Sequence, residues 1–584
     1  MHKATKKVFK IFAKIIGFCV IIVTATAIVT GSLVLFDLIK ERGGSFYETF
    51  QQRLYTMARG VIRHEDDSGE NRFLMQNVRT ELESLRNRQL AIEQSILEEF
   101  QSGDYSFEDP LIVNDLYGIS PLTALVLFRT EEPERISIYI EGDTKLADVS
   151  YTFKGYQNDH VIPVYGLYPD RDNKVCLTSA KKNGAKRETV LTISTEALPD
   201  NLTHEIIQAR VYEESSYQTG FTFTLLGNNE KSQRAALDAN GEYRWCLDLF
   251  GREPILANAG MAGNYNNGIS VLFSIGNYGT GNAWILEFNL LGKLLNVWYT
   301  PYGVHHDIAV DGDSIWVTGG NDTGSHEALL SQIDRKTGEM LTTIDFRQIL
   351  QPLRDQTRFL HDLTKYYNFN DWCHMNSVDF NGADLVVSCR NQSTVLCMDR
   401  EGNIQWMLCD PTDYLPYFQQ FILTPTGEGF EYPYSQHAAD VLPDQDGDPY
   451  TVDILLFDNG DFHRPDDEKS SRMVQYRINE KEMTVEQIWS YGGDLNETYS
   501  EIHGDADLLK NGNRLGSFEP YHANTGVRYA YGVEVSEDGD LVWDCWRMNK
   551  TVGGSYKEYR LERLEIYSAA ANDLQLGAAA NLLF

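Results

Sequence analysis

Most of the chain is a succession of short apolar runs separated by turns rich in Gly, Asp and Asn. The runs begin soon after Tyr117 and continue almost to the C-terminal end. Within many of them apolar and polar residues alternate, which is the pattern of a strand with one buried face. The pattern therefore predicts an all-β fold for the body of the protein.

One unit of this pattern recurs. In each copy a strand ends in a polar turn, usually with glycine, and the next strand ends at an aromatic residue. The six copies run from Asp238 to Trp245, Asn289 to Trp298, Asp334 to Phe346, Asp399 to Trp406, Asn479 to Trp489 and Glu537 to Trp543. Because one small sheet cannot bury both of its faces alone, such units pack around an axis. The repeat predicts a six-bladed β-propeller over residues 213–567.

A separate set of alternating strands precedes the repeat, from about Ala124 to Ile193. Short strands at this spacing are typical of a small β-sandwich. We therefore expect an N-terminal β-sandwich domain at residues 113–212. The Ala-rich residues 568–584 are expected to form a tail.

The N-terminal region is apolar and then polar. The stretch Ile15–Phe36 carries no charge and follows five lysines, so it is long enough to cross a bilayer with the N-terminus in the cytoplasm. We expect a basic cytoplasmic segment at 1–14 and a transmembrane signal-anchor at 15–37. Ala25-Thr26-Ala27 could be cleaved, but the apolar run continues past it, which favours an uncleaved anchor. The rest of the chain would then lie outside the cytoplasm, at the cell surface or in the periplasm.

Residues 38–112 have a helical pattern. Apolar residues recur at three- and four-residue spacing among Glu, Arg and Gln, most clearly at Leu74, Val78, Leu82 and Leu85. The pattern predicts a helical stalk, which could also join two copies of the chain as a homodimer. A helix that simply packs on the following domain has the same pattern, so these interpretations stay open.

The charge and the cysteine content of the chain limit the classes of function that it can have. The chain has 84 acidic and 51 basic residues, and nucleic-acid binding needs a basic surface, so we expect no nucleic-acid partner. A small anionic substrate is still compatible if a buried pocket concentrates positive charge. The eight cysteines include no C-x-x-C pair. Cys373, Cys389, Cys397 and Cys409 fall in one blade-sized stretch, where a disulfide and reduced core cysteines are both compatible with the spacing.

Histidine begins the same short phrase at four places. The phrases start at His306, His374, His437 and His503, and each leads through a turn into a hydrophobic strand. These strands are expected at Ile315–Val317, Leu385–Val387, Val452–Phe457 and Leu515–Phe518. Equivalent positions of successive blades face the axis of a propeller, so we expect the four histidines to surround one channel.

Two further polar residues accompany this ring. Arg390 ends the strand after His374, and Asn376 lies two residues after that histidine. A guanidinium with amide and imidazole donors suits a tetrahedral oxyanion, while another histidine can act as nucleophile or proton carrier. Neutral imidazoles also bind zinc or copper, so a metal site is a second hypothesis. A third is a non-catalytic propeller that binds a partner through its loops.

Several phrases resemble those of the bacterial arylsulfate sulfotransferases that do not use 3'-phosphoadenylyl sulfate, over about residues 115–567. The matching phrases are Tyr117–Leu125, Val164–Pro169, His305–Asp307, Asp371–Ser377, Ser388–Arg390 and Gln436–Ala438. The resemblance implies a six-bladed propeller with an added β domain, in agreement with the repeat. Well-studied relatives have a cleaved signal peptide and a closely spaced disulfide, whereas this chain has an expected anchor and more distant cysteines.

The resemblance also implies a reaction. A phenolic sulfate ester gives its sulfuryl group to a histidine, and a second phenol takes it in a ping-pong cycle without metal or nucleotide cofactors. His437 matches the sulfated histidine. The residues that match those around the sulfuryl group are His306, His374, Asn376 and Arg390. Either His306 or His374 would protonate the departing phenolate.

Two other histidines are assigned to substrate binding. His305 could exchange roles with His306, but His306 is the one in phase with the other phrases. His503 belongs to the ring and is expected to line the channel in a supporting role.

Overall fold

The computed structural model describes residues 69–198, 205–228, 231–249, 255–256, 259–276, 281–321, 325–354, 372–414, 416–460, 470–493, 498–522, 527–549 and 559–584. The chain divides into two compact units, residues 1–62 and 63–584. The fold and the site described below belong to the second unit. The cytoplasmic segment and signal-anchor expected at 1–14 and 15–37 lie outside the described residues. Among the helices in the described ranges, none is both long and apolar enough to span a membrane.

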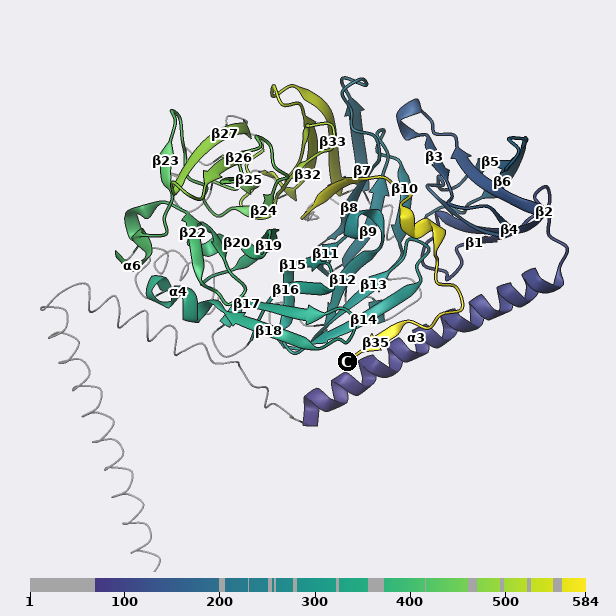
Figure 1. The fold of residues 1–584 in the computed structure, drawn as a ribbon, viewed down its shortest axis with the longest axis horizontal. Coiled ribbons are helices and arrows are strands. Elements are labelled where there is room, and N and C mark those ends of the chain that lie inside the picture. Colours follow the sequence, from purple (N-terminus) through teal and green to yellow (C-terminus); the bar gives the residue numbers. More distant parts are fainter. Residues whose placement is uncertain are drawn as a thin grey trace, which may run out of the picture. The chain divides into compact units, whose positions relative to one another are not determined.

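Antiparallel β-sheet makes up nearly all of this unit (Figure 1). The prediction of an all-β, propeller-like body is therefore confirmed. The α-helices are α3 (Gly69–Ser102), α4 (Phe346–Arg354) and α6 (Pro416–Gln419). Short 3-10 turns are η1 (Lys145–Ala147), η3 (Asn266–Gly268), η4 (Arg390–Gln392), η5 (Pro411–Asp413) and η6 (Ala569–Asn572).

The first sheet is built around one long strand. Its strands are β1 (Leu111–Asn114), β2 (Thr123–Ile140), β3 (Val149–Thr152), β4 (Gln157–Tyr165), β5 (Asp172–Lys181) and β6 (Lys186–Ser194). The first part of β2 pairs with β1 and β4, and its last part pairs with β3 and β5. The single strand β2 thus pairs with two strands in its first half and with two others in its second half. Its apolar side chains, such as Leu125 and Ile138, lie in a common core.

The following strands form antiparallel groups of four, each with its first strand at one edge. Two groups are β11 (Ala259–Asn264), β12 (Val271–Gly276), β13 (Ala283–Phe288) and β14 (Leu294–Thr300), then β15 (Gly303–Asp311), β16 (Ser314–Asn321), β17 (Ser325–Asp334) and β18 (Met340–Asp345). Their first strands meet in a parallel bridge between Gly263 and Asp307, which joins both groups into one sheet.

Three more groups follow in the same order. They are β19 (Met375–Asn381), β20 (Asp384–Cys389), β21 (Thr394–Met398) and β22 (Ile404–Leu408); β24 (His437–Val441), β25 (Thr451–Asp458), β26 (Arg472–Asn479) and β27 (Thr484–Gly492); and β28 (Asp505–Leu508), β29 (Arg514–Phe518), β32 (Ala530–Val535) and β33 (Leu541–Asn549). The strands expected after the four histidine phrases are β16, β20, β25 and β29, so those predictions are confirmed.

The remaining group joins two distant parts of the chain. It contains β8 (Phe221–Asn228), β9 (Lys231–Leu237) and β10 (Tyr243–Leu247), and its edge strand is β34 (Leu561–Leu564) from near the C-terminal end. Similarly, β7 (Glu205–Val211) pairs with β33, and Figure 1 shows these strands side by side. The ends of the β8–β34 region are therefore held together by backbone hydrogen bonds.

Smaller strands extend the sheets. They are β23 (Thr424–Thr426) on β27, β35 (Asn581–Leu583) on β14, and the hairpin of β30 (Tyr521–His522) and β31 (Val527–Arg528). Residues 568–584, expected as a tail, thus lie on the body through β35.

Aspartates fasten the first strands of neighbouring groups to one another. The backbone N–H of Val378 in β19 donates to Asp307 in β15 at 2.9 Å, and the N–H of Val441 in β24 donates to Asp379 in β19 at 2.6 Å. The same contact joins Leu561 N–H to Asp505 at 2.9 Å. Each bond satisfies a backbone donor on the side of the strand where its own sheet has no further strand. Asp307, Asp379 and Asp505 therefore each hold the edge strand of one group against the edge strand of a neighbouring group.

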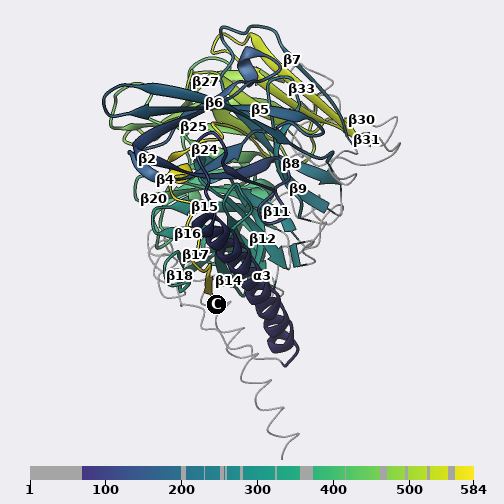
Figure 2. The same cartoon turned by 90° about the vertical axis from the view of Figure 1, so that its right-hand side faces the viewer.

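Helix α3 lies against the body along β14 and β35 (Figures 1 and 2). Leu82 and Leu85 are buried in the same core as the first sheet. Gln89 donates to the Gly292 carbonyl at 2.8 Å, and its side-chain oxygen accepts from a backbone N–H of β14 at 2.9 Å. Glu93 pairs with the buried Lys293 at 2.8 Å. Packing on the body, one of the interpretations left open by the sequence, is thus what the described helix does.

Candidate active site

The four phrase histidines lie together at the first strands of their groups. His306 is in β15, His374 immediately precedes β19, His437 begins β24 and His503 lies two residues before β28. Ring centroids are 4.9 Å apart between His306 and His374, 5.8 Å between His306 and His437, and 6.5 Å between His437 and His503. His374 is partly exposed, and the other three are buried. The grouping of the four histidines that their phase predicts is therefore present in the structure.

The same backbone conformation recurs at these positions. His306, His374 and His503 have φ of 58°, 53° and 66°, and Ala438, next to His437, has φ of 48°. This left-handed region is uncommon for residues with a side chain and costs about 1–3 kcal/mol each where the structure enforces it. Strand register also shifts at three of these places, in β15, β19 and β24. Bulges of this kind redirect side chains, which explains why the phrase repeats.

The tautomer of His437 is set by a neighbouring amide. The Asn459 side-chain nitrogen donates to the carbonyls of Ser500 at 2.9 Å and His503 at 2.7 Å. With both of its protons used, Asn459 can offer only its oxygen to His437 Nδ1, which lies 2.7 Å away. Nδ1 therefore carries the ring proton, and Nε2 keeps a lone pair. Of the two ring nitrogens, Nε2 is the one available as a nucleophile.

His437 is also held neutral. Its burial and, secondly, the nearby Arg390 cation hold the pKa of His437 well below its usual value. Both causes disfavour the imidazolium form. The nucleophilic form therefore persists at pH values where an exposed histidine would be protonated.

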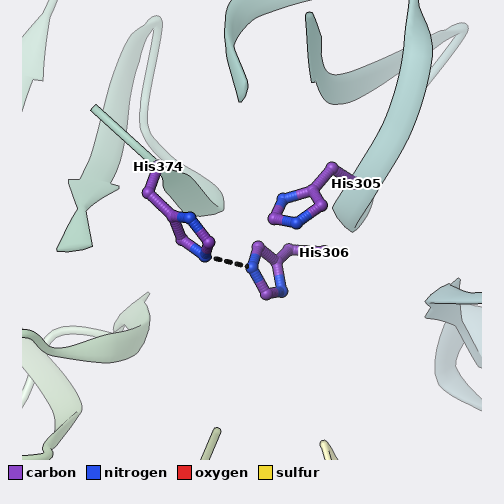
Figure 3. A group of neighbouring side chains, drawn as sticks. All are labelled: His305, His306 and His374. Atoms are coloured by element: carbon purple, nitrogen blue, oxygen red, sulfur yellow. Dashed lines mark hydrogen bonds between the residues drawn. The ribbon is translucent and has the colours of Figure 1, made fainter. Parts of the chain in front are cut away.

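His306 and His374 form a direct pair. Their Nε2 atoms are 2.8 Å apart, so one ring donates its proton to the other (Figure 3). The Tyr559 ring stacks on His306 with centroids 4.9 Å apart and planes 28° apart. Its hydroxyl donates to the backbone carbonyl of Asn376 at 3.0 Å. A transferable proton thus lies beside His437, in a pair braced by an aromatic ring.

Arg390 and Asn376 both lie near His437: Arg390 acts on its charge, and Asn376 bonds to the residue before it. Arg390 begins η4, directly after β20, and its backbone N–H donates to the His374 carbonyl at 3.1 Å. Its guanidinium donates to the Asn391 side chain at 2.9 Å and to the Glu501 carbonyl at 3.1 Å. Asn376 donates to the Gln436 carbonyl at 2.7 Å, next to His437. The structure therefore assembles these predicted residues around the His437 ring.

His503 has a carboxylate partner. Its Nδ1 lies 2.6 Å from the Glu519 carboxylate, and both side chains are buried. The Glu519 backbone N–H donates in turn to the Ser500 hydroxyl at 2.7 Å. A buried carboxylate fixes which nitrogen of a histidine carries the proton and how the ring is oriented.

Sequence reasoning missed Asn459, Glu519 and Tyr559. Asn459 and Glu519 come directly after β25 and β29, just as Arg390 comes directly after β20. In the groups of His437 and His503, the residue after the second strand thus supplies a side-chain partner to the histidine at or just before the first strand. That shared phase with Arg390 is a signal that the sequence contains. Tyr559 lies before β34 and has no comparable repeat.

Three of the histidines also have metal-ligand spacing. One ring nitrogen from each of His305, His306 and His374 lies within 4.8 Å of the other two, and Figure 3 shows the three rings grouped together. Three imidazoles with one open position would suit a zinc ion. However, Arg390 places a positive charge at the same site, which favours an oxyanion over a metal cation.

The chain matches family models over most of its length. Residues 200–542 match the family described as Arylsulfotransferase (ASST), and residues 111–196 match the Arylsulfotransferase Ig-like domain. The first match contains the histidines of the ring, and the second covers the β1–β6 sheet.

Two curated proteins are similar to the chain. Both are named Arylsulfate sulfotransferase AssT, one from Escherichia coli O6:H1 (strain CFT073) and one from Lelliottia amnigena. Each is 24% identical, and each match covers 70% of this chain and 84% of the relative. Among solved structures, a quinohemoprotein alcohol dehydrogenase from Comamonas testosteroni is 11% identical, with a TM-score of 0.29 over 67% of this chain and 75% of that one.

Proposed function

Because the chain belongs to the arylsulfotransferase (ASST) family, we propose that it transfers a sulfuryl group from a phenolic sulfate ester to a phenol in two steps through His437. The family assignment makes the protein an aryl-sulfate sulfotransferase. The observation that carries the two-step route is the free Nε2 lone pair of His437, fixed by Asn459.

In the first step, Nε2 of His437 attacks the sulfur atom. A nitrogen–sulfur bond forms while the sulfur–oxygen bond to the phenol breaks, and the bonding electrons leave on the phenolic oxygen. That oxygen takes a proton from the His306–His374 pair, which enters the step with one ring protonated as an imidazolium, in addition to the proton that its Nε2 atoms share. The pair leaves the step neutral and ready to accept a proton in the second step. Charge on the sulfuryl oxygens is balanced by Arg390, with Asn376 as a further donor, in the manner of a loose phosphoryl-transfer transition state.

In the second step, a phenol displaces the histidine. Its proton passes to the His306–His374 pair, its oxygen bonds to sulfur, and the nitrogen–sulfur electrons return to Nε2. The neutral Asn459 amide holds the Nδ1 proton but cannot accept it. The sulfated ring therefore stays cationic, which makes it a better leaving group than a neutral imidazole would be.

The test compares phenolate release from an aryl sulfate in the presence and in the absence of an acceptor phenol. The full chain in detergent is given a chromogenic aryl sulfate, and phenolate release is followed before and after a second phenol is added. We expect release to rise with the acceptor and the sulfate ester of that acceptor to form. A rate of phenolate release that is the same with and without the second phenol would mean simple hydrolysis. No release from folded protein would favour a non-catalytic propeller that binds a partner.

Asn459→Ala is expected to lower turnover on the order of 10²-fold, since the ring then loses its fixed tautomer and orientation. Single-turnover sulfation of His437, followed by intact-protein mass, measures this step directly. Asn173→Ala is the matched control, because Asn173 is another buried amide that is hydrogen-bonded on both sides but lies in β5. If the two variants sulfate at equal rates, the tautomer argument is wrong.

A metal-dependent reaction is the second candidate, favoured by the spacing of His305, His306 and His374. The sulfuryl-transfer steps above need no metal, so stripping the full chain with a zinc chelator is expected to leave transfer unchanged. Metal content before and after treatment shows whether stripping occurred. Activity that falls with the metal and returns with added zinc would favour this candidate instead.

The architecture and location belong to the same proposal. We take the four-stranded groups as the blades of the six-bladed propeller that the repeat predicts. The uncharged stretch Ile15–Phe36 would anchor the enzyme in the cell membrane with the catalytic part outside the cytoplasm. Protease treatment of spheroplasts, whose outer membrane has been opened, checks the orientation, since a body outside the cytoplasmic membrane is digested and a cytoplasmic one is protected.

A further inference from the structure

Two cysteines stand beside the residues that hold the sulfuryl group. Cys373 directly precedes His374, and Cys389 ends β20 directly before Arg390. Their sulfur atoms are 3.5 Å apart, with the Cys373 thiol directed at the Cys389 sulfur. Both side chains are fully buried. The two sulfurs are thus already in contact, away from water.

The backbone around this contact is fixed by hydrogen bonds. The Asn391 N–H donates to the Cys373 carbonyl at 3.2 Å, and the Arg390 N–H donates to the His374 carbonyl at 3.1 Å. The two cysteines therefore lie on neighbouring segments that are held together by backbone hydrogen bonds, with Cys389 opposite Met375 and Cys373 two residues before that position. To form a disulfide, the two sulfurs would close from 3.5 Å to about 2.05 Å.

The other cysteines of this sheet have different neighbours. Cys409 is buried against the side chains of Tyr414 and Thr394, and Cys397 lies in β21 near Asn381. Neither has a sulfur contact among the residues that the structure describes. The closeness of Cys373 and Cys389 is therefore a property of this pair and not of the cysteine-rich stretch as a whole.

We propose that Cys373 and Cys389 form a disulfide when the chain folds in an oxidising compartment. Each thiol loses its proton and the new sulfur–sulfur bond removes two electrons, which pass to the disulfide of a protein thiol oxidant and reduce it to two thiols. Because both sulfurs are buried in the folded protein, the exchange takes place before this sheet closes. The bond ties together the segments that carry His374 and Arg390.

The bond would act on the geometry of the site. His374 has the left-handed φ of 53°, and Arg390 lies on the adjacent segment. A cross-link one residue before each of them limits how far either can relax. It also restricts the unfolded chain by closing a short loop, which stabilises the fold.

The experiment maps the two thiols in the full chain. Protein produced by secretion and purified without reductant is denatured in an alkylating agent, digested and analysed by mass spectrometry. We expect a linked peptide pair containing Cys373 and Cys389, lighter by two hydrogens than the separate peptides, with Cys397 and Cys409 alkylated. Cys397→Ser serves as the matched control and should keep the linked pair. Alkylation of Cys373 and Cys389 as free thiols in this preparation would overturn the proposal.

Reduction gives a second, independent readout. A phosphine reductant is expected to lower Tm by roughly 2–4 °C in the wild type and in Cys397→Ser. The Cys373→Ser/Cys389→Ser variant should start at the lower Tm and show no response. If that variant does not fold, the change in the wild-type Tm on reduction and the peptide map still test the proposal. A wild-type Tm that is unchanged after full reduction of a mapped bond would contradict the stabilising role.

Discussion

His437→Ala is expected to lower aryl sulfate turnover by at least roughly 10⁴-fold, because it removes the atom that bonds to sulfur in both steps. Burial and the Asn459 amide prepare one nitrogen of this ring for that role. The measurement pairs steady-state turnover with the intact mass of the protein after mixing with an aryl sulfate. Wild-type protein should gain the mass of one SO₃ group, and the variant should gain none.

A second buried histidine provides the control for this variant. His160 lies in β4, stacked on Phe128 with centroids 4.7 Å apart. His160→Ala should therefore lower stability while keeping both turnover and labelling. If His437→Ala is labelled, or keeps more than about a hundredth of the wild-type rate, the covalent route through His437 is wrong.

Arg390→Met is expected to lower turnover by roughly 10³-fold, since the charge on the sulfuryl oxygens loses its guanidinium partner in the proposed site. The same change should move the acid side of the pH profile. His437 must be neutral to attack, and Arg390 is one of the causes that hold its pKa low. Removing the cation raises that pKa, so activity should begin to fall at a higher pH than in the wild type.

Arg390→Lys separates charge from shape. It keeps the positive charge that lowers the pKa of His437 but loses the planar fork that binds two oxygens at once. We therefore expect a lower rate with the acid side of the profile near its wild-type position. An Arg390→Met profile that coincides with the wild type would show that Arg390 does not act on His437.

The sequence was informative where the structure repeats a backbone device. His306, His374 and His503 share a left-handed φ, and His437 precedes Ala438, which has one. Because the same backbone conformation recurs in several sheets, a similar short sequence recurs with it. The grouping of the four histidines could therefore be predicted from their spacing alone. The strands that follow the phrases were predictable for the same reason, because their apolar runs alternate within a single segment.

The hydrogen-bond partners of these histidines, which lie after a different strand, were harder to predict. Asn459 is 22 residues from His437, and Glu519 is 16 residues from His503, with two strands between the members of each pair. Nothing in the alternation of one strand identifies which turn returns to the channel. The pairing of β34 with β8 was equally hard to predict, since the register between strands far apart in the sequence depends on how the sheets pack together.

That pairing of β34 with β8 has a consequence for biosynthesis. The sheet that contains β8, β9 and β10 gains its edge strand only from residues 561–564, so it stays incomplete until nearly the entire polypeptide has been made. If the chain crosses a membrane as it is synthesised, the earlier sheets can form on the far side in order of arrival. The β8 sheet must then wait for the final segment to emerge, and ribosome-bound or truncated chains that end before Leu561 should expose the β8 edge to chaperones and proteases.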